Sequence, residues 1–258
     1  MPLAVAAAVD RLLAGRKGAG PVAPLTEIDP ELSTEQAYAL QGALEKALVA
    51  QGERVIGWKA GFTSVALQES YGVPEPVCGF MLASGVFSSG DAVPFSRFKG
   101  LGVEVEVAFL LRADLAGPGV TPASALLAVE GAMPSLELID FRLSGKPQGV
   151  DVIADGVYTN AIVLGRPLSP LVGIDLSVEG VVYEQNGQIV GTHTAAEVMG
   201  NPLSSLAWLA NKLGALGRTL GAGDVVLSGS ISKVLRPRAG ESIRASFTRL
   251  GSVSCRFV

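Results

Sequence analysis

The sequence is poor in the residues that most often build metal sites and covalent active sites. Among 258 residues there is one histidine, His193, and there are two cysteines, Cys78 and Cys255, with no C-x-x-C pair. A multi-histidine metal site is excluded, a cysteine-based zinc site is disfavoured, and the absence of a G-x-S-x-G motif speaks against a Ser-His-Asp triad. The polar run around His193 predicts a surface turn. Isolated cysteines suit a reducing cytoplasm.

Charged residues are also scarce, at 17%, and aromatic residues make up 6%, whereas 48% of the chain is hydrophobic. The net charge is −4, and no basic patch with interleaved aromatics is present, which argues against nucleic-acid binding. No apolar stretch reaches 18 residues, and the N-terminal apolar run lacks the basic start of a signal peptide. We therefore expect a cytoplasmic globular protein with a sizeable core.

Helical patterns dominate residues 1–54. Ser33 and Gln36 form a capping box, and apolar residues follow at helical spacing. From residue 55 onward, short strands bounded by turn residues predominate, at 55–61, 102–112, 134–140, 157–164, 176–184, 224–228, 243–247 and 253–257. Further helices are predicted at 121–131 and from Pro202 to about Gly217, whereas 143–151 resembles a loop.

These elements predict an α+β protein. Many short strands and 32 glycines favour a mixed β-roll or barrel with flanking helices. We divide the chain into a helical N-terminal segment, residues 1–54, and a catalytic β-roll domain, residues 55–258.

Two glutamates, Glu104 and Glu106, interrupt an apolar run one residue apart. Alternation with valines predicts a strand, on which residues i and i+2 point to the same face, about 6.5–7 Å apart at the backbone. Burying two like charges is costly unless a cation lies between them, and oxygen ligands suit Mg²⁺, Mn²⁺ or Ca²⁺ better than zinc. A strand that exposes both glutamates to water is the alternative.

A third acidic residue, Glu137, lies within another apolar segment, 134–140. Together with Glu104 and Glu106 it would form a three-carboxylate site with positions left open for water and substrate, an arrangement in which Mg²⁺ is commonly bound. The competing interpretation is that Glu137 or Asp140 is a solvated strand residue.

Several stretches, in this order and spacing, resemble the fumarylacetoacetate hydrolase superfamily, specifically its 2-keto-4-pentenoate hydratase/4-oxalocrotonate decarboxylase branch. The resemblance covers nearly the whole chain after residue 30. The matching stretches are 57–63, 102–109, 136–142, 154–155, 200–210, 222–230 and 250–253.

The resemblance implies a mixed β-sheet roll of the superfamily's C-terminal type, a Mg²⁺ or Mn²⁺ site and a 2-oxo acid or 2-hydroxydienoate substrate; we also expect a homo-oligomer. Lys59 falls on the active-site lysine of the family, although by itself it resembles a snorkelling surface residue. Ser228 and Gly229 would offer a hydroxyl and backbone donors to the substrate carboxylate. The family's metal ligands fall on Glu104, Glu106 and Glu137.

The chain departs from many hydratases of the branch at two places. It has Val77 and Cys78 where they carry an acidic residue, and Tyr158 where they carry a small polar one, so Tyr158 is expected to contact the substrate and reshape the pocket.

The leading interpretation is a metal-dependent hydratase, a lyase that converts a 2-hydroxy-2,4-dienoate to a 4-hydroxy-2-oxo acid in aromatic catabolism. The alternatives are a 4-oxalocrotonate decarboxylase, an acylpyruvate-type C–C hydrolase and a domain with a structural Ca²⁺ site.

Overall fold

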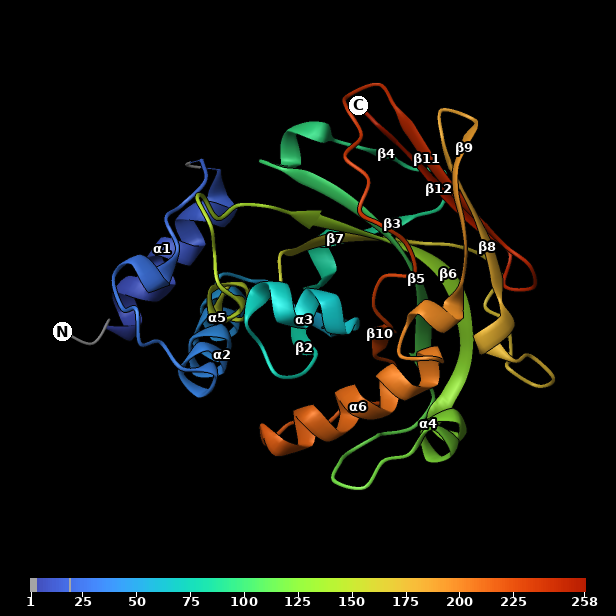
Figure 1. Ribbon diagram of the computed structural model, residues 1–258, viewed down its shortest axis with the longest axis horizontal. Coiled ribbons are helices and arrows are strands. Elements are labelled where there is room, and N and C mark those ends of the chain that lie inside the picture. The colour runs from blue at the N-terminus through green and yellow to red at the C-terminus, as the bar shows by residue number, and fades with distance from the viewer. Residues whose placement is uncertain (1–3, 19) are drawn as a thin grey trace.

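Two curled β-sheets form the body of the protein, which a computed structural model describes for residues 4–18 and 20–258 (Figure 1). The first sheet has the strand order β2-β1-β10-β5-β6-β7-β3. Its strands are β1 (Val55–Gly61), β2 (Val77–Leu82), β3 (Val86–Ser88), β5 (Leu101–Leu111), β6 (Val129–Asp140), β7 (Thr159–Leu164) and β10 (Val225–Leu227). Because β1 and β10 pair in parallel whereas β5 and β6 pair antiparallel, the sheet is mixed, as predicted.

The second sheet has the order β4-β12-β11-β8-β9 and contributes the opposite wall of the roll. Its strands are β4 (Ala92–Val93), β8 (Gly180–Gln185), β9 (Gln188–Thr194), β11 (Ser242–Phe247) and β12 (Ser252–Phe257). The turn at Asn186 and Gly187 joins β8 to β9 in a β-hairpin. The polar turn predicted around His193 is wrong, because this residue lies within β9.

Helices flank the roll, and their ends follow the capping signals in the sequence. The capping box of Ser33 and Gln36 opens α2, and Asn201 caps α6 with Pro202 at its first position. The α-helices are α1 (Val5–Lys17), α2 (Thr34–Ala50), α3 (Val65–Tyr71), α4 (Pro122–Ala128), α5 (Gly149–Ala154) and α6 (Pro202–Ala215). Short 3₁₀ turns lie at η1 (Leu25–Glu27), η2 (Ala83–Gly85), η3 (Phe95–Arg97), η4 (Leu176–Val178) and η5 (Ala195–Glu197).

Several of the predicted boundaries are wrong; the strand predicted at 176–184, for example, begins only at Gly180, after η4. Helix α4 ends at Ala128, because Val129 already pairs with Leu111 at the start of β6. The loop predicted over 143–151 contains the beginning of α5, which depends on a long-range contact: the carboxylate of Asp151 accepts hydrogen bonds from the backbone and hydroxyl of Thr26, over 2.9 and 2.8 Å.

The N-terminal helices pack on the same apolar core as the roll. In Figure 1 α1, α2 and α5 lie together on the side away from the second sheet. Gln41 of α2 donates hydrogen bonds to the carbonyls of Cys78 and Ile153, over 2.9 and 2.7 Å, and Tyr38 accepts one from the Cys78 amide. The division of the chain at residue 55 stays a prediction.

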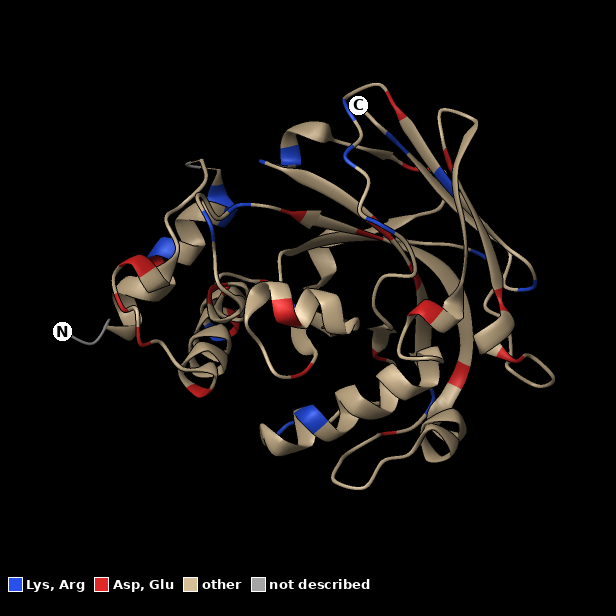
Figure 2. Cartoon of the chain, viewed as in Figure 1, with Lys and Arg blue, Asp and Glu red and all other residues tan. Residues whose placement is uncertain are grey.

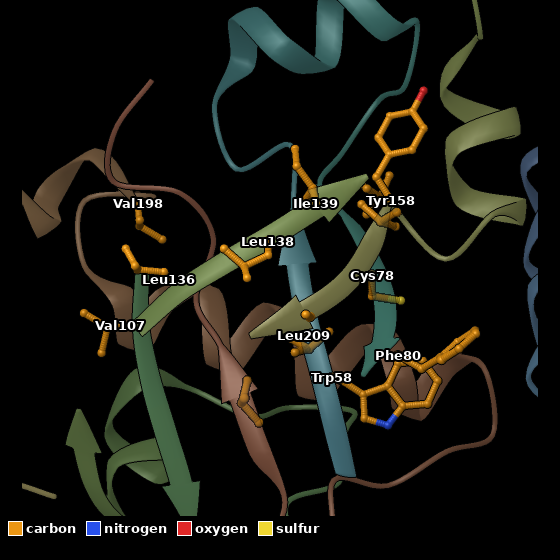
Figure 3. Close-up of a cluster of buried hydrophobic side chains, with 14 of the residues drawn as sticks. Trp58, Cys78, Phe80, Val107, Leu136, Leu138, Ile139, Tyr158, Val198 and Leu209 are labelled. Atoms are coloured by element: carbon orange, nitrogen blue, oxygen red, sulfur yellow. The ribbon is translucent and has the colours of Figure 1, made fainter. Parts of the chain in front are cut away.

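Apolar side chains from β1, β2, β5, β6 and α6 fill the interior (Figure 3). Trp58 and Phe80 meet edge to face with ring centroids 6.4 Å apart. Acidic and basic residues are interspersed along the chain (Figure 2). No helix among the described residues has both the length and the hydropathy needed to cross a membrane.

Candidate metal centre and active site

Three glutamates converge on the long central strands. Glu104 and Glu106 lie on one face of β5, and the register of β5 and β6 places Glu137 directly opposite Glu104. One carboxylate oxygen from each residue lies within 4.8 Å of the others. The strand alternation predicted from the sequence therefore brings these three carboxylates together.

Hydrogen bonds fix the orientation of two of the carboxylates. Glu106 Oε2 accepts from the Gly229 amide over 2.7 Å. Glu137 is fully buried; its Oε1 accepts from the Thr159 hydroxyl over 3.0 Å, and its Oε2 accepts from the Lys59 amine over 2.9 Å. Glu104 is half-buried and faces the cavity described below.

The electrostatics of this cluster are dominated by burial and like charge. Burial raises the pKa of Glu104 to about 7, with Lys59 opposing the shift and Glu137 adding to it. Burial and the repulsion of the two other carboxylates raise the pKa of Glu106 well above its ordinary value. Burial alone would lower the pKa of Lys59, but its three carboxylate neighbours outweigh that effect and raise it.

The donor set fits a divalent cation bound through oxygen. Three carboxylates share one buried amine, so the cluster carries more negative than positive charge when ionised. A hard cation would relieve that repulsion, and two of the three carboxylates face an open cavity from which water or substrate oxygens would complete the coordination. Glu104, Glu106 and Glu137 are the residues that would hold it.

A cavity of about 460 Å³ opens beside the carboxylates. Lys59, Glu104 and Glu106 lie at one part of its wall, and Glu137 lies behind them. Most of the remaining wall is apolar or aromatic, with contributions from Phe62, Leu67, Tyr71, Ile139, Phe141, Val157, Tyr158, Ile231 and Val234. The site therefore combines a charged end with a largely apolar chamber.

Three cavity residues hold a backbone conformation that L-residues rarely adopt. Phe62, Val157 and Tyr158 have φ of 53°, 57° and 59°. Such left-handed conformations in non-glycine residues are costly and cluster at functional sites. Tyr158, predicted to contact the substrate, does line the cavity. The centroid of its ring lies 5.2 Å from the centroid of the Phe141 ring.

The predicted substrate-binding residues Ser228 and Gly229 are not part of the cavity wall. Ser228 is fully buried away from the cavity wall; its hydroxyl accepts from the Val107 amide and donates to the Gly229 carbonyl, each over 3.3 Å. The amide of Gly229 is taken by Glu106. Ser230 lines the cavity instead. The turn after β10 thus presents the second serine to the cavity, and a role of the Ser228 hydroxyl in substrate binding stays a prediction.

Val77 and Cys78, where the family resemblance implies an acid in many hydratases, are not part of the cavity wall. Cys78 is fully buried and packs toward the hydroxyl of Tyr38, and burial raises the pKa of its thiol to about 12. Val77 packs behind Gly61 and Val157. The apolar lining of the cavity therefore comes mainly from residues of other segments.

Sequence reasoning missed a second group of polar residues on the cavity wall. His193 comes from β9, Glu197 from η5 and Lys233 from the segment after β10. The alternation of Gly191 and His193 with two threonines was the available signal, because residues i and i+2 of a strand share a face.

Comparisons with known proteins agree with this geometry. Residues 54–258 match the family described as fumarylacetoacetate (FAA) hydrolase C-terminal. The 2-hydroxyhexa-2,4-dienoate hydratase of Comamonas testosteroni is 35% identical over 253 residues, covering 96% of this chain and 95% of that protein. A 4-oxalocrotonate decarboxylase of Pseudomonas putida is 34% identical over 230 residues, covering 89% and 87%.

Among solved structures, the 4-oxalocrotonate decarboxylase from Pseudomonas putida G7 complexed with magnesium and adipate superimposes with a TM-score of 0.94. It is 31% identical, and the match covers 98% of this chain and 97% of that one. Both the fold and the sequence relationship thus extend over almost the whole length. The chain belongs to the fumarylacetoacetate hydrolase C-terminal family.

Proposed function

We propose that this protein is a metal-dependent hydratase that converts a 2-hydroxy-2,4-dienoate into a 4-hydroxy-2-oxo acid. The observation that carries the proposal is the cluster of Glu104, Glu106 and Glu137 with Lys59 at the charged end of an apolar cavity. The hydratase from Comamonas testosteroni, similar over almost the full length, supports this assignment.

The cation is Mg²⁺ or Mn²⁺ in this proposal, since the ligands are all carboxylates. When bound, it supplies a Lewis acid that stabilises negative charge on the 2-oxygen of the substrate. The related decarboxylase complexed with magnesium and adipate supports a hard cation in a protein of this family. The apolar walls would receive the hydrocarbon end of the substrate.

Lys59 is the catalytic residue of the proposal. Its amine lies on the cavity wall and donates to Glu137, which keeps it beside the carboxylate cluster. From that position it would transfer protons to and from C3 of the substrate, the carbon bonded to C2. Tyr158 contributes a substrate-binding surface, and Gly229 acts by holding Glu106 through its amide.

A second candidate reaction is decarboxylation of 4-oxalocrotonate. The mainly apolar wall around Phe141, Val157 and Tyr158 favours it, because an apolar environment destabilises a carboxylate that is about to leave as CO₂. The decarboxylase relatives support it as well.

The proposal includes assembly into a homo-oligomer in the cytoplasm. Ile189 and Val190 expose 65% and 48% of their surface on β9, which ends the second sheet and leaves an edge open to a second copy. Cys78 and Cys255 are free thiols, which suits a reducing compartment. Sedimentation of the purified protein tests the assembly.

Side-by-side assays with Mg²⁺ distinguish the two reactions. The hydratase assignment expects loss of the ultraviolet absorbance of 2-hydroxypenta-2,4-dienoate, or of its 5-substituted analogue, with formation of the 4-hydroxy-2-oxo acid. Release of CO₂ from 4-oxalocrotonate without hydration of either dienoate would replace it by the decarboxylase assignment.

A further inference from the structure

The single histidine of the chain lies on the inner face of the roll. In the register of β8 and β9, His193 pairs with Val181, and Gly191 pairs with Tyr183. Val181 and Tyr183 are both buried, with 2% and 1% of their surfaces exposed. Because paired residues of an antiparallel ladder share a face, the side chain of His193 points inward with them.

The neighbouring residues of β9 explain why the imidazole reaches the cavity. Thr192 and Thr194 are exposed on the outer face, whereas His193 is half-buried. Gly191 has no side chain, and a Cβ placed there would lie 2.8 Å from His193 Nε2. The ring therefore occupies the space that a larger residue at position 191 would fill.

His193 shares the cavity with the charged centre. It lines the same chamber of about 460 Å³ as Lys59 and Glu104. Tyr183, its neighbour on the inner face, donates a hydrogen bond to the carbonyl of Val103, the residue before Glu104. Within residues 4–18 and 20–258, no hydrogen bond or ion pair engages the imidazole. The ring is thus free to hold a water molecule in the chamber.

Hydration needs a group that the carboxylate cluster does not supply. After the dienol has become the 2-oxo-3-enoate, a water oxygen must bond to C4 while one of its protons is removed. Lys59, which transfers protons in the proposed function, lies at the charged end of the chamber beside Glu137. Val77 and Cys78, where the family resemblance implies an acid in many hydratases, are buried and lie outside the cavity wall. A proton acceptor on another wall of the chamber would supply this step.

We propose that His193 is a further catalytic residue, which positions and deprotonates the water that adds to C4. This inference rests on the proposed hydratase function. The water O–H bond breaks, its oxygen bonds to C4, and its proton passes to a ring nitrogen of His193. The C3–C4 π electrons form a double bond between C3 and C2 and leave the charge on the 2-oxygen. C3 then takes up a proton, so that water has been added across C3 and C4 without any other reactant.

Glu197 is the other acceptor on this part of the wall, but its position suits the role less well. It belongs to the short turn η5 and is exposed to solvent, where bulk water surrounds the carboxylate. His193 is held on a strand within the sheet and is half-buried. Imidazole is also the side chain most often used for general acid–base catalysis.

The test separates water addition from the chemistry at C3. We would compare His193→Gln with the wild type in two assays with Mg²⁺: hydration of a 2-hydroxy-2,4-dienoate, and exchange of the C3 hydrogens of 2-oxopentanoate with D₂O, followed by NMR. The second compound lacks the 4-hydroxyl group, so its exchange needs the charged centre alone. Thr192→Gln places the same side chain on the outer face of β9 and serves as the matched control.

His193→Gln is expected to lower kcat for hydration by a factor of about 10² or more, with a smaller change in KM. Hydrogen exchange at C3, calorimetric Mg²⁺ binding and the melting temperature should stay near wild type, as should every property of Thr192→Gln. Unchanged hydration in His193→Gln, or equal losses of hydration and exchange, would overturn the proposed role of His193 but leave the proposed hydratase function standing. If the wild-type protein hydrates no dienoate, the proposed function fails and this inference fails with it.

Discussion

The Lys59 amine donates a hydrogen bond to Glu137 Oε2 over 2.9 Å, and the two side chains are 4% and 0% exposed. The pair joins β1 to β6 across the first sheet, although 78 residues separate the two positions in the chain. Because Lys59 also lines the cavity, one side chain both neutralises part of the carboxylate cluster and faces the substrate. Removal of the amine should therefore lower turnover but should not weaken Mg²⁺ binding.

Lys59→Met keeps most of the side-chain volume but removes the amine. We expect turnover to fall by a factor of about 10² or more, as is usual when a general acid–base group is lost. Mg²⁺ binding, measured by calorimetry, should remain at least as tight, because the cation no longer competes with an ammonium group for Glu137. Loss of Mg²⁺ binding together with turnover would instead make Lys59 a structural support for the ligands.

Glu104→Gln, Glu106→Gln and Glu137→Gln should each abolish tight Mg²⁺ binding and activity while the protein stays folded. Glu104→Gln and Glu106→Gln each remove one charge from a repelling cluster, so these two metal-free variants should melt no lower than the wild type. Glu130→Gln, on an exposed position of β6, is the matched control. A Glu137→Gln protein that binds Mg²⁺ as tightly as wild type would show that the buried third glutamate is not a ligand.

The stability of the metal-free protein should depend on pH through Glu104 and Glu106. Their pKa values lie above the ordinary 4.5, at about 7 for Glu104, so between these values the folded state binds more protons than the unfolded chain. The free energy of unfolding therefore decreases as pH rises through this window. Below the window both carboxyls are protonated, and the cost of burying their charges is absent.

Mg²⁺ would replace the protons that favour the fold at low pH. Its stabilising effect should thus grow from about pH 5 to about pH 8. Thermal denaturation with Mg²⁺ or with a chelator, at both pH values, measures this. The difference should be smaller in Glu104→Gln, and an equal Mg²⁺ shift at both pH values would contradict the assignment of these carboxylates as ligands.

The parts of the site that follow from local periodicity could be predicted from the sequence. Alternation around Glu104 and Glu106 gives a strand and a shared face, and the antiparallel register of the next long strand then brings Glu137 opposite. The orientation of Ser228 could not be predicted, because the direction in which a turn presents its residues depends on its backbone hydrogen bonds, here from the Ser228 amide to the Val107 carbonyl. His193 was missed because its inward direction depends on pairing with β8.

The buried hydrogen bond from Thr159 to Glu137 should contribute to metal affinity. Thr159→Val removes the hydroxyl at nearly constant volume and leaves Glu137 Oε1 without its donor. Loss of such a partner to a ligand typically weakens binding by about 10-fold or more. Calorimetric Mg²⁺ titration measures the change, and Thr159→Ser, which restores a hydroxyl, should recover most of the affinity. A Ser variant as weak as the Val variant would mean that packing, not the hydrogen bond, sets the affinity.

Tyr158 should set the preference for the hydrocarbon end of the substrate. Its ring lines the cavity beside Phe141, so an apolar substituent at C5 of the dienoate would bury surface that the unsubstituted compound leaves uncovered. Each buried methylene contributes about 0.8 kcal/mol, or roughly fourfold in kcat/KM. The wild-type protein should therefore favour a 5-alkyl dienoate over the unsubstituted one. Tyr158→Asn, which tolerates the φ of 59°, should reduce that ratio, whereas Tyr158→Phe should keep it. If the ratio is the same in all three proteins, other residues of the apolar wall determine the preference.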